Sequence, residues 1–579
     1  MKLLHCWTVL ASVCAMAAQL AWAAADLVFT NGIIHTHDAA TSVVSAVAIQ
    51  NGRFVYVGDD AGAAAQIGPT TTVEDLQQRM ALPGLIDSHM HPTMTVIMKS
   101  GVVVTGENIQ AYLQCIQQYY AANTGLTFVA GMGWMNVVVP SNGPTSKELD
   151  SVVSNIPAAI ISGDGHSMWL NTLALQQSGI AAMKKDPPGG RIMRDRKTKK
   201  ATGTIREWGA MLHVFQLLGQ PPMEALLEPL KQQFAWFNSL GITTLHDAGL
   251  MYDMMNGVTI AALEELARRG ELTVRVRGAA YLTPYAKVKD TDAVMAKVMT
   301  EVNKHTNALF QMRAAKFLVD GVVEGRTALL DKPYLVDKPK QKGLRMWKPA
   351  VLKKATHAVH ALGLQAHFHG IGDGATHAAL DALQYSAKHG GGNHRDLITH
   401  LELVRPSDIP RFASLNVIAV PQPVWGIQDD LYPLEVSYLG QYRADHQYPL
   451  RSFLNAGVLL ASASDFPAAA GAMPDPNPML GMQVAVTRWL PDFSNSPPYW
   501  VEEAISLTDV LYSYTINGAY ANFLETETGS IVVGKAADFV VLDGNLYTRD
   551  PRTICAVKVV KTLLCGKTVF PPAGAAATR

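Results

Sequence analysis

The sequence predicts an α/β fold: a (β/α)8 TIM barrel that carries a small β-sandwich domain and one large insertion. Three observations predict it. Short apolar strands alternate with helical stretches along the middle of the chain, which is typical of βαβ units around a parallel sheet. Eight of these strands end in polar residues, and eight such units close into a barrel. The two ends of the chain are instead rich in short strands and turns.

The first 25 residues have the order of an export signal. Lys2 supplies a short positive end, an apolar run follows, and small residues at Ala21–Ala23 offer a cleavage site. We therefore expect residues 1–25 to be a signal peptide and the mature chain to be periplasmic or secreted. The alternative is a retained membrane anchor, which the alanine-rich run with few Leu, Ile and Val residues disfavours.

Strand-rich segments from both termini are expected to build the β-sandwich. Residues 26–82 contain two Asn-Gly dipeptides between alternating Val and Ile residues, which is hairpin chemistry, and residues 523–579 have a similar pattern. One domain assembled from both termini would hold the ends of the middle domain together. Cys555 and Cys565, in the second segment, could form one bridge or stay buried thiols.

The barrel is expected over residues 83–522, with its active site at the C-terminal ends of the strands. An insertion at about residues 93–240 separates the first two strands. An insertion of this size on that face is more often a lid or a specificity module than inert decoration. The expected strands are LPGLIDSH, GITTLHD, LTVRVRG, RAAKFLVDG, GLQAHFHG, LITH, NVIAVPQP and GVLLASASD.

Charge and length indicate a small-molecule partner. The chain has 48 Lys+Arg and 48 Asp+Glu residues, so no net basic field attracts nucleic acid or an anionic membrane. After the signal, no apolar segment is long enough to span a bilayer. At 579 residues the chain exceeds one ordinary core, which fits a large domain with a smaller companion. A homodimer is left open.

Three His-x-His pairs are candidates for a metal site. Residues i and i+2 of a strand point to the same face, and neutral imidazole is a common zinc ligand. One pair alone is weak evidence. The pair on the first barrel strand gains weight because four other strands also carry ligand-type residues. The pairs are His35 with His37, His89 with His91, and His367 with His369; the further residues are Lys316, His369, His400 and Asp465.

Six motifs, DSHMHP, AKFLVDG, HGIGD, ITHLELV, ASDFP and GSIVVGKAADFVVLD, carry a resemblance to a known family. In this order they resemble the amidohydrolase superfamily, and within it the YtcJ-like group of metal-dependent hydrolases, which includes N-substituted formamide deformylases. The resemblance runs from about Asp26 to Phe570. It implies metal-assisted hydrolysis of amide or amide-like bonds.

The resemblance also implies a ligand set for two metal ions, with Zn²⁺ the expected metal and other divalent metals as alternatives. Asp465 matches an aspartate that binds the first metal and handles protons. Lys316 matches a lysine that can be carboxylated to bridge the two metals. The remaining matches are His89 and His91 for the first metal, and His369 and His400 for the second.

Lys316 as a ligand has a physical rationale. Its ammonium form would repel zinc, but its neutral amine can take up carbon dioxide and become an anionic oxygen ligand. In the alternative, Lys316 pairs with Asp320 or with a substrate carboxylate over a single metal ion.

The other histidines near these motifs are expected to play supporting parts. His35 and His37 fall in the β-sandwich and are expected at its surface. His367 lies one pleat deeper than His369, where barrel interiors are packed in layers, so we expect it to pack there or to orient a ligand. The same expectation covers His246, Asp247 and Glu402.

Four positions match substrate-contacting motifs of the same group: Trp134, His166, Arg326 and Gln422. His166 and Arg326 are also expected to act in catalysis, by binding the carbonyl oxygen or anchoring the substrate. Trp134 could equally be a core residue. Glu324 departs from the family pattern, which has a small or neutral residue there, so the substrate cannot be carried over from the family.

The resulting hypothesis is an exported zinc-dependent amidohydrolase that cleaves a C–N bond of an amide, formamide or cyclic amide with a metal-activated water. Asp465 would take the proton of that water and deliver it to the leaving nitrogen. Two alternatives remain. The same scaffold could hydrolyse an ester, lactone or carbamate, or the chain could be a non-catalytic metal-binding or regulatory protein.

Overall fold

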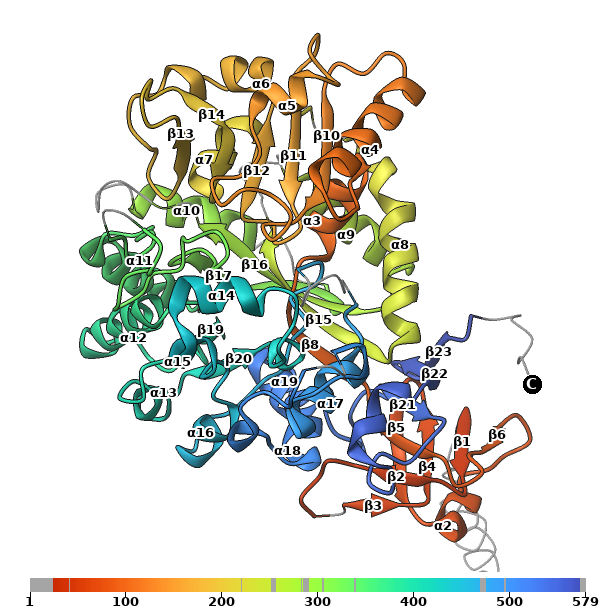
Figure 1. Cartoon of the computed structure of the whole chain (residues 1–579). Helices are drawn as coiled ribbons and strands as arrows, with labels where there is room; N and C mark the ends of the chain where they lie inside the picture. Colours follow the sequence, from red (N-terminus) through yellow and green to blue (C-terminus); the bar gives the residue numbers. More distant parts are fainter. Residues whose placement is uncertain are drawn as a thin grey trace, which may run out of the picture.

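The structure, a computed structural model, describes residues 24–572 except 41, 220, 251–256, 283, 285–290, 303, 305–306, 338–339, 469–474 and 494–495. Figure 1 shows three parts: a barrel in the middle, an insertion above it, and a β-sandwich where both ends of the chain meet. The expected signal peptide lies almost wholly outside the described residues. No helix in the described part is long and apolar enough to cross a membrane.

A parallel sheet of seven strands forms the wall of the barrel within the described chain. Its strands follow one another in sequence order around the wall, each paired to the next in parallel register, which confirms the predicted fold class. In order around the wall they are β20 (Ile418–Pro421), β19 (Leu397–His400), β18 (Gln365–Gly370), β17 (Phe310–Leu318), β16 (Arg275–Leu282), β15 (Ile242–Leu250) and β8 (Leu85–Met90).

The eighth expected strand closes the barrel without being a regular strand. On one side, the amides of Ala461 and Ala463 donate to β20 and its end; on the other, the carbonyl of Ser462 accepts from Ser88 of β8. The prediction of a strand is wrong here because the ladder is broken: the Ser462 amide donates to the carbonyl of Ser513 instead. The segment still delivers Asp465 to the barrel mouth, where its amide donates to the carbonyl of His89 at 2.9 Å.

Amphipathic helices cover the outside of the barrel. In α11, for example, Val351, Leu352, Ala355 and Val359 are buried, which is the spacing of one helical face. The larger helices around the barrel are α8 (Glu224–Ser239), α9 (Val258–Arg269), α10 (Thr291–Val302), α11 (Pro349–Ala361), α12 (Asp373–Lys388), α13 (Ile409–Ser414), α14 (Tyr432–Leu439), α16 (Leu450–Asn455), α17 (Pro478–Thr487), α18 (Leu507–Ser513) and α19 (Ile516–Ala521).

The insertion after β8 is a layer of its own above the strand ends (Figure 1). Its mixed sheet has the order β13-β14-β12-β11-β10-β9, and Trp134 and Trp169 belong to its own hydrophobic core. The strands are β9 (Val102–Val103), β10 (Val129–Trp134), β11 (Ala158–Ser162), β12 (Ser167–Leu170), β13 (Arg191–Arg194) and β14 (Ala201–Arg206); the helices are α3 (Pro92–Lys99), α4 (Ile109–Ala122), α5 (Ser146–Asp150), α6 (Thr172–Gln177) and α7 (Trp208–Phe215).

The β-sandwich combines strands from both termini, as predicted. The antiparallel pair of β7 and β21 joins the two ends of the chain, and the ring of Phe539 stacks on Phe29 at 5.0 Å in the core. One sheet has the order β5 (Arg53–Gly58), β4 (Ala46–Gln50), β1 (Leu27–Thr30), β6 (Thr72–Asp75); the other has β23 (Lys567–Phe570), β22 (Val559–Leu564), β21 (Phe539–Leu542), β7 (Met80–Pro83), β2 (Ile33–His35), β3 (Val43–Val44).

The structure decides two expectations for the sandwich. His37 is not at the surface: its side chain is buried, its Nδ1 lies 2.7 Å from Thr515 Oγ1 at the start of α19, and it docks the sandwich on the barrel. The two cysteines are not bridged. Cys555 and Cys565 are both free, and Cys565 Sγ accepts a hydrogen bond from Arg275 at 2.8 Å.

Candidate metal centre

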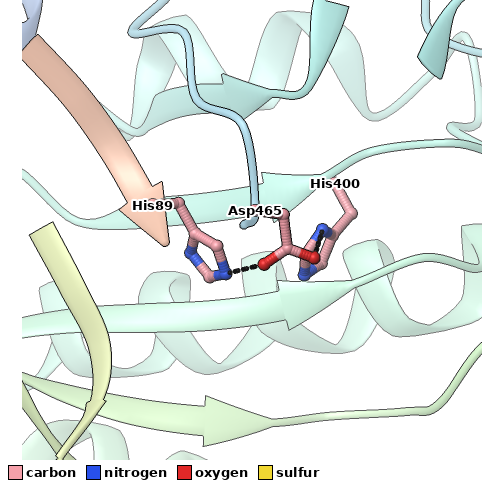
Figure 2. A group of neighbouring side chains, drawn as sticks. All are labelled: His89, His400 and Asp465. Atoms are coloured by element: carbon pink, nitrogen blue, oxygen red, sulfur yellow. Dashed lines mark ion pairs between the residues drawn. The ribbon is translucent and has the colours of Figure 1, made fainter. Parts of the chain in front are cut away.

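The six predicted ligands meet at the C-terminal ends of the barrel strands. Figure 2 shows His89, His400 and Asp465 pointing at one another across the barrel mouth. His89 Nε2 and His91 Nε2 lie 3.0 and 3.3 Å from Asp465 Oδ1, and His400 Nδ1 lies 3.9 Å from Asp465 Oδ2. His89, His400 and Asp465 form a group whose ligand atoms could reach one ion.

Asp465 is buried and remains ionised. Burial raises its pKa, but His400, His91 and Lys316 outweigh burial, and the net pKa falls below its usual value. Its Oδ1 receives no well-formed hydrogen bond within the described chain, although it faces two imidazoles. A buried carboxylate oxygen without a donor suits a cation.

A series of hydrogen bonds behind His89 explains why His89 does not donate to that oxygen. Asn522 donates through Nδ2 to the carbonyl of Gly518 at 2.9 Å, so its Oδ1, 2.9 Å from His246 Nδ1, must accept a proton from that nitrogen. His246 Nε2 then accepts from His367 Nδ1 at 3.1 Å, and His367 Nε2 accepts from His89 Nδ1 at 2.7 Å.

The protonation of these hydrogen-bonded histidines leaves the Nε2 lone pair of His89 free at the site. Burial lowers the pKa of His246 to about 4 and those of His367 and His89 well below their usual value, so all three rings are neutral. With its single proton on Nδ1, His89 presents an unprotonated Nε2 toward Asp465. A lone pair 3.0 Å from a carboxylate oxygen is stabilised by a cation between or beside them. The residues therefore fit a divalent metal.

Lys316 extends this group from β17. Its buried Nζ lies 3.3 Å from His89 Nε2, and burial lowers its pKa to about 7, against the opposing effect of Asp465. A large fraction of the amine is therefore neutral near pH 7. The alternative pairing with Asp320 is wrong, because the carboxylate of Asp320 accepts the amides of Leu329, Ile371 and Gly372 instead.

His369 and His400 form the other side of the site. Their ring centroids lie 4.3 Å apart, and His400 Nδ1 lies 3.0 Å from Gln422 Oε1. His400 and Asp465 both have positive φ, 75° and 59°. Such backbone is costly for residues other than glycine and is often found at functional sites. Burial lowers the pKa of His400 to about 3, so its ring is neutral.

The insertion supplies His166, whose ring centroid lies 5.1 Å from that of His369. His166 Nδ1 lies 2.7 Å from the buried carboxylate of Glu207. Burial lowers the pKa of His166, but Glu207, helped by Asp164 and Glu324, more than compensates and raises it to about 9. The ring is therefore a cationic hydrogen-bond donor at neutral pH, placed over the strand ends.

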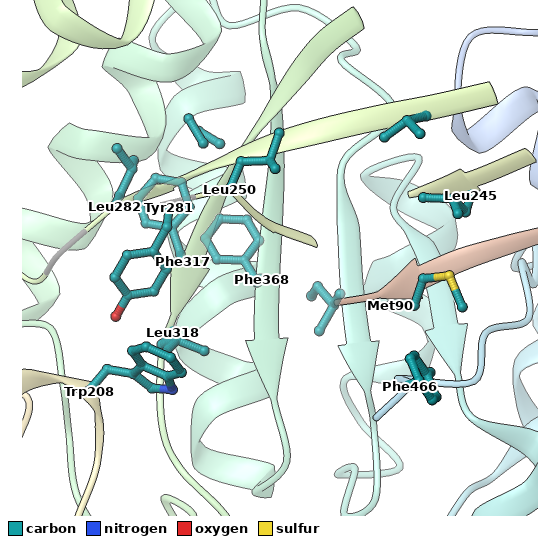
Figure 3. Packing of buried hydrophobic residues seen from close by; sticks show 14 of the residues in the cluster. Met90, Trp208, Leu245, Leu250, Tyr281, Leu282, Phe317, Leu318, Phe368 and Phe466 are labelled. Carbon is teal, nitrogen blue, oxygen red and sulfur yellow. The ribbon is translucent and has the colours of Figure 1, made fainter. Parts of the chain in front are cut away.

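Two cavities meet at these residues. The smaller, about 70 Å³, has an apolar wall that includes Trp208, Tyr281 and Leu318, which Figure 3 shows close together. The larger, about 330 Å³, extends between the insertion and the loops after the strands. Both share His166, His369, His400 and Asp465 in their walls. A bond held at these four residues would have one substituent in each cavity.

Three residues predicted to contact substrate are engaged by other parts of the protein. Trp134 is fully buried in the core of the insertion, where its Nε1 donates to the carbonyl of Ile160. Arg326 is engaged by Asp337 at 2.6 Å and by the carbonyl of Ser141, so it ties the loop after β17 to the insertion. Gln422 is fully buried and contacts His400, which it orients.

The remaining supporting predictions agree with the structure in part. His367 and His246 lie behind His89 as expected, and Asp247 accepts from Thr93 Oγ1 at 2.7 Å. Glu402 lines the larger cavity instead of orienting a ligand. Sequence reasoning missed Glu207 and Asn522, because each acts on a histidine far away in the chain and neither belongs to a recognisable motif.

Comparisons with known proteins identify relatives along nearly the whole chain. The model of a family described as the amidohydrolase family matches residues 72–570. The chain is 30% identical over 560 residues to LONG AFTER FAR-RED 3 of Arabidopsis thaliana, covering 94% of this chain and 92% of that protein. It is 26% identical over 556 residues to the putative amidohydrolase YtcJ of Bacillus subtilis, covering 94% and 99%.

Two further comparisons concern an enzyme and a solved structure. Identity to the N-substituted formamide deformylase of Arthrobacter pascens is 25% over 549 residues, covering 91% of this chain and 94% of the enzyme. An uncharacterized metal-dependent hydrolase from Pyrococcus horikoshii has the same fold, with a TM-score of 0.69 at 22% identity over 91% of this chain and 99% of that one.

Proposed function

We propose a hydrolytic function from one premise: the chain belongs to the amidohydrolase family, as its six motifs suggested. The protein is proposed to be a zinc-dependent amidohydrolase that cleaves the C–N bond of an amide, formamide or cyclic amide in a small molecule. The observation that carries the proposal is the unprotonated Nε2 of His89, held 3.0 Å from the ionised carboxylate of Asp465 at the barrel mouth.

The residues that would hold two zinc ions are His89, His91, Lys316, His369, His400 and Asp465. When bound, zinc would act as a Lewis acid on the scissile carbonyl and lower the pKa of water toward neutrality. The imidazole and carboxylate donors suit zinc. We propose that Lys316 is carboxylated, which its burial and its pKa of about 7 support.

Asp465 is the proposed proton carrier. Its carboxylate is ionised, so it can accept a proton from the attacking water, and it lines both cavities, so it can return that proton to a leaving nitrogen in either. His166, cationic and fixed by Glu207, is proposed to donate a hydrogen bond to the carbonyl oxygen as negative charge develops on it.

We also propose that the mature enzyme is exported. The order of Lys2, the apolar run and the small residues at Ala21–Ala23 supports cleavage of a signal peptide. N-terminal sequencing of protein from a native periplasmic or secreted fraction should start between Ala24 and Leu27. Recovery of an intact Met1 from that fraction would contradict export.

A substrate panel tests the reaction. Zinc-loaded protein should hydrolyse at least one class among N-formyl, N-acyl and cyclic amides, and lose that activity in His89→Ala. Hydrolysis of esters, lactones or carbamates alone would show that the protein is an ester, lactone or carbamate hydrolase and not an amidohydrolase. Full metal loading with no turnover in any class would favour a non-catalytic metal-binding protein.

A further inference from the structure

The larger cavity has an acidic wall on the side formed by the loops after β17 and β19 and by α14. Glu324, Glu402 and Glu435 line it, with Asp429 nearby in the same wall. Among the described residues, no lysine or arginine lies within ion-pair distance of these three glutamates. The cations in the wall are otherwise placed: Lys99 is exposed and contacts the ring of Phe466, and His166 is paired with Glu207.

Glu402 is the member of this wall without a full set of partners. It is 6% exposed, and its Oε2 has no hydrogen-bond donor within the described chain. A buried carboxylate oxygen without a donor is unfavourable by itself. Because Glu402 lines the cavity, a group bound there could supply the missing donor.

The neighbouring carboxyls crowd this wall with acidic groups. Glu435 accepts a hydrogen bond from Gln447 Nε2 at 2.8 Å, so one of its oxygens is fixed in place. Burial, and then the charge of Asp429, raises the pKa of Glu435 to about 8, so its ionised form is disfavoured unless a cation lies beside it. A bound cation would relieve that crowding.

Aromatic side chains complete the same wall: Trp425, Tyr448 and Tyr499. Aromatic faces attract ammonium and guanidinium groups. Trp425 also stacks on the ring of His400, with 5.5 Å between centroids, so this wall continues directly into the metal centre.

We propose that the larger cavity selects substrates that carry a positively charged nitrogen, an ammonium or a guanidinium, which binds Glu402 and the aromatic wall. The inference rests on the proposed amide hydrolysis and adds a substrate class to it. The scissile bond would lie at Asp465 and His166, and the cationic substituent would extend away from the metal centre into the larger cavity.

A binding experiment tests the charge preference without turnover. The probes are 2-phenylethylammonium and its neutral analogue 2-phenylethanol, titrated by calorimetry into the full-length, zinc-loaded protein. The ammonium should bind at least about tenfold more tightly, since a hydrogen bond to a buried charge exceeds a neutral one by about that factor. Equal affinity of the two probes for the wild type would overturn the proposal, whatever the variants do.

Two variants locate the preference. In Glu402→Gln the affinity ratio should fall toward one. The matched control is Glu503→Gln: Glu503 is equally buried, at 5% exposure, but its carboxylate accepts hydrogen bonds from Ser452 and it does not line the cavity. Glu503→Gln should keep the wild-type ratio. A ratio that survives in Glu402→Gln would show that the cation binds elsewhere.

A kinetic pair separates this inference from the proposed reaction. N-formyl-1,4-diaminobutane carries an ammonium where N-formylpentylamine has a methyl group, and kcat/KM should be higher for the charged amide. Hydrolysis of both at equal rates, with equal probe binding, would overturn the inference and leave the reaction standing. No hydrolysis of any amide, with Glu402-dependent ammonium binding, would overturn the reaction and support the charge preference.

Discussion

The proton of His89 is placed by a residue that never touches the metal centre. Asn522 fixes the tautomer of His246, which fixes that of His367, which fixes that of His89. Each step follows because a neutral imidazole has one donor and one acceptor. The fold thereby determines which nitrogen of His89 is free for a ligand, and it does so through three strands and the end of α19.

Asn522→Leu tests this chain. The variant removes the acceptor for His246, so the tautomers of the three histidines are no longer fixed. Zinc affinity should fall by about tenfold, which is the smaller loss expected when a residue that orients a metal ligand is mutated. Affinity is measured by competition with a chelator. Asn517→Ala, in the same helix and donating to the carbonyl of Leu460, is the control and should bind zinc as the wild type does. Wild-type zinc affinity in Asn522→Leu would contradict the claim that Asn522 fixes the tautomer of His89.

Lys316 offers a test of carboxylation. Lys316→Ala should bind less zinc and be nearly inactive, because the variant cannot form the proposed carbamate ligand. Short carboxylic acids such as acetate should occupy the vacated space and restore part of the turnover. Metal analysis and turnover on one preparation, with and without acetate, decide the matter. If Lys316→Ala kept both metals and full turnover, Lys316 would not be a metal ligand that turnover requires.

At the scale of elements, strand ends were the predictable part of the site. The two-residue period of a strand and the parallel order of the barrel bring His89, Lys316, His369 and His400 to one mouth. Trp134 and Arg326 could not be placed in this way. Their directions depend on how the insertion packs on itself and on the loop after β17, which no local pattern encodes.

Irregular elements were equally hard to predict. The last barrel segment has the apolar pattern of a strand, but its amide at Ser462 is bonded to Ser513, so it is not a strand in the structure. His37 has the polar character of a surface residue, but packing of the sandwich against α18 and α19 buries it beside Tyr512 and Thr515. In both, long-range contacts override the local signal.

The buried His37 predicts an acid-sensitive junction. Burial, helped by His35, lowers its pKa from 6.5 to about 3. Between pH 6.5 and about pH 3 the unfolded chain binds a proton at His37 that the native state excludes. The contribution of His37 to the free energy of unfolding is therefore fully present above pH 6.5 and decreases as the pH falls below it. Asparagine tolerates the φ of 53° at this position, so His37→Asn should still fold. Between pH 7 and pH 5 its free energy of unfolding should fall by about 1–2 kcal/mol less than that of the wild type.

Urea unfolding at the two pH values, followed by circular dichroism, measures this difference. The exposed His389→Asn is the control and should lose as much stability as the wild type. If His37→Asn also loses as much as the wild type, the acid sensitivity lies in other histidines and not at this junction.

At the scale of the whole molecule, the site belongs to no single domain. The barrel supplies the six candidate ligands, the insertion supplies His166 and the roof of both cavities, and the end of the barrel region supplies Asn522. The β-sandwich lies at the opposite end and holds the two termini together (Figure 1). The insertion and the loops line most of the cavities, whereas the barrel supplies the candidate metal ligands. The residues that select the substrate can therefore change without changing the ligands.

The central claim is that zinc and Asp465 act together in C–N hydrolysis. The most direct test is to remove the metal with a chelator, restore it stepwise, and measure bound zinc and amide turnover on the same samples of wild type and Asp465→Asn. Wild-type turnover should rise from nearly zero with bound zinc. Asp465→Asn should fold, keep most of its zinc and turn over at least about a hundredfold more slowly. Undiminished turnover in the metal-free wild type, or unchanged activity per bound zinc in Asp465→Asn, would contradict the claim.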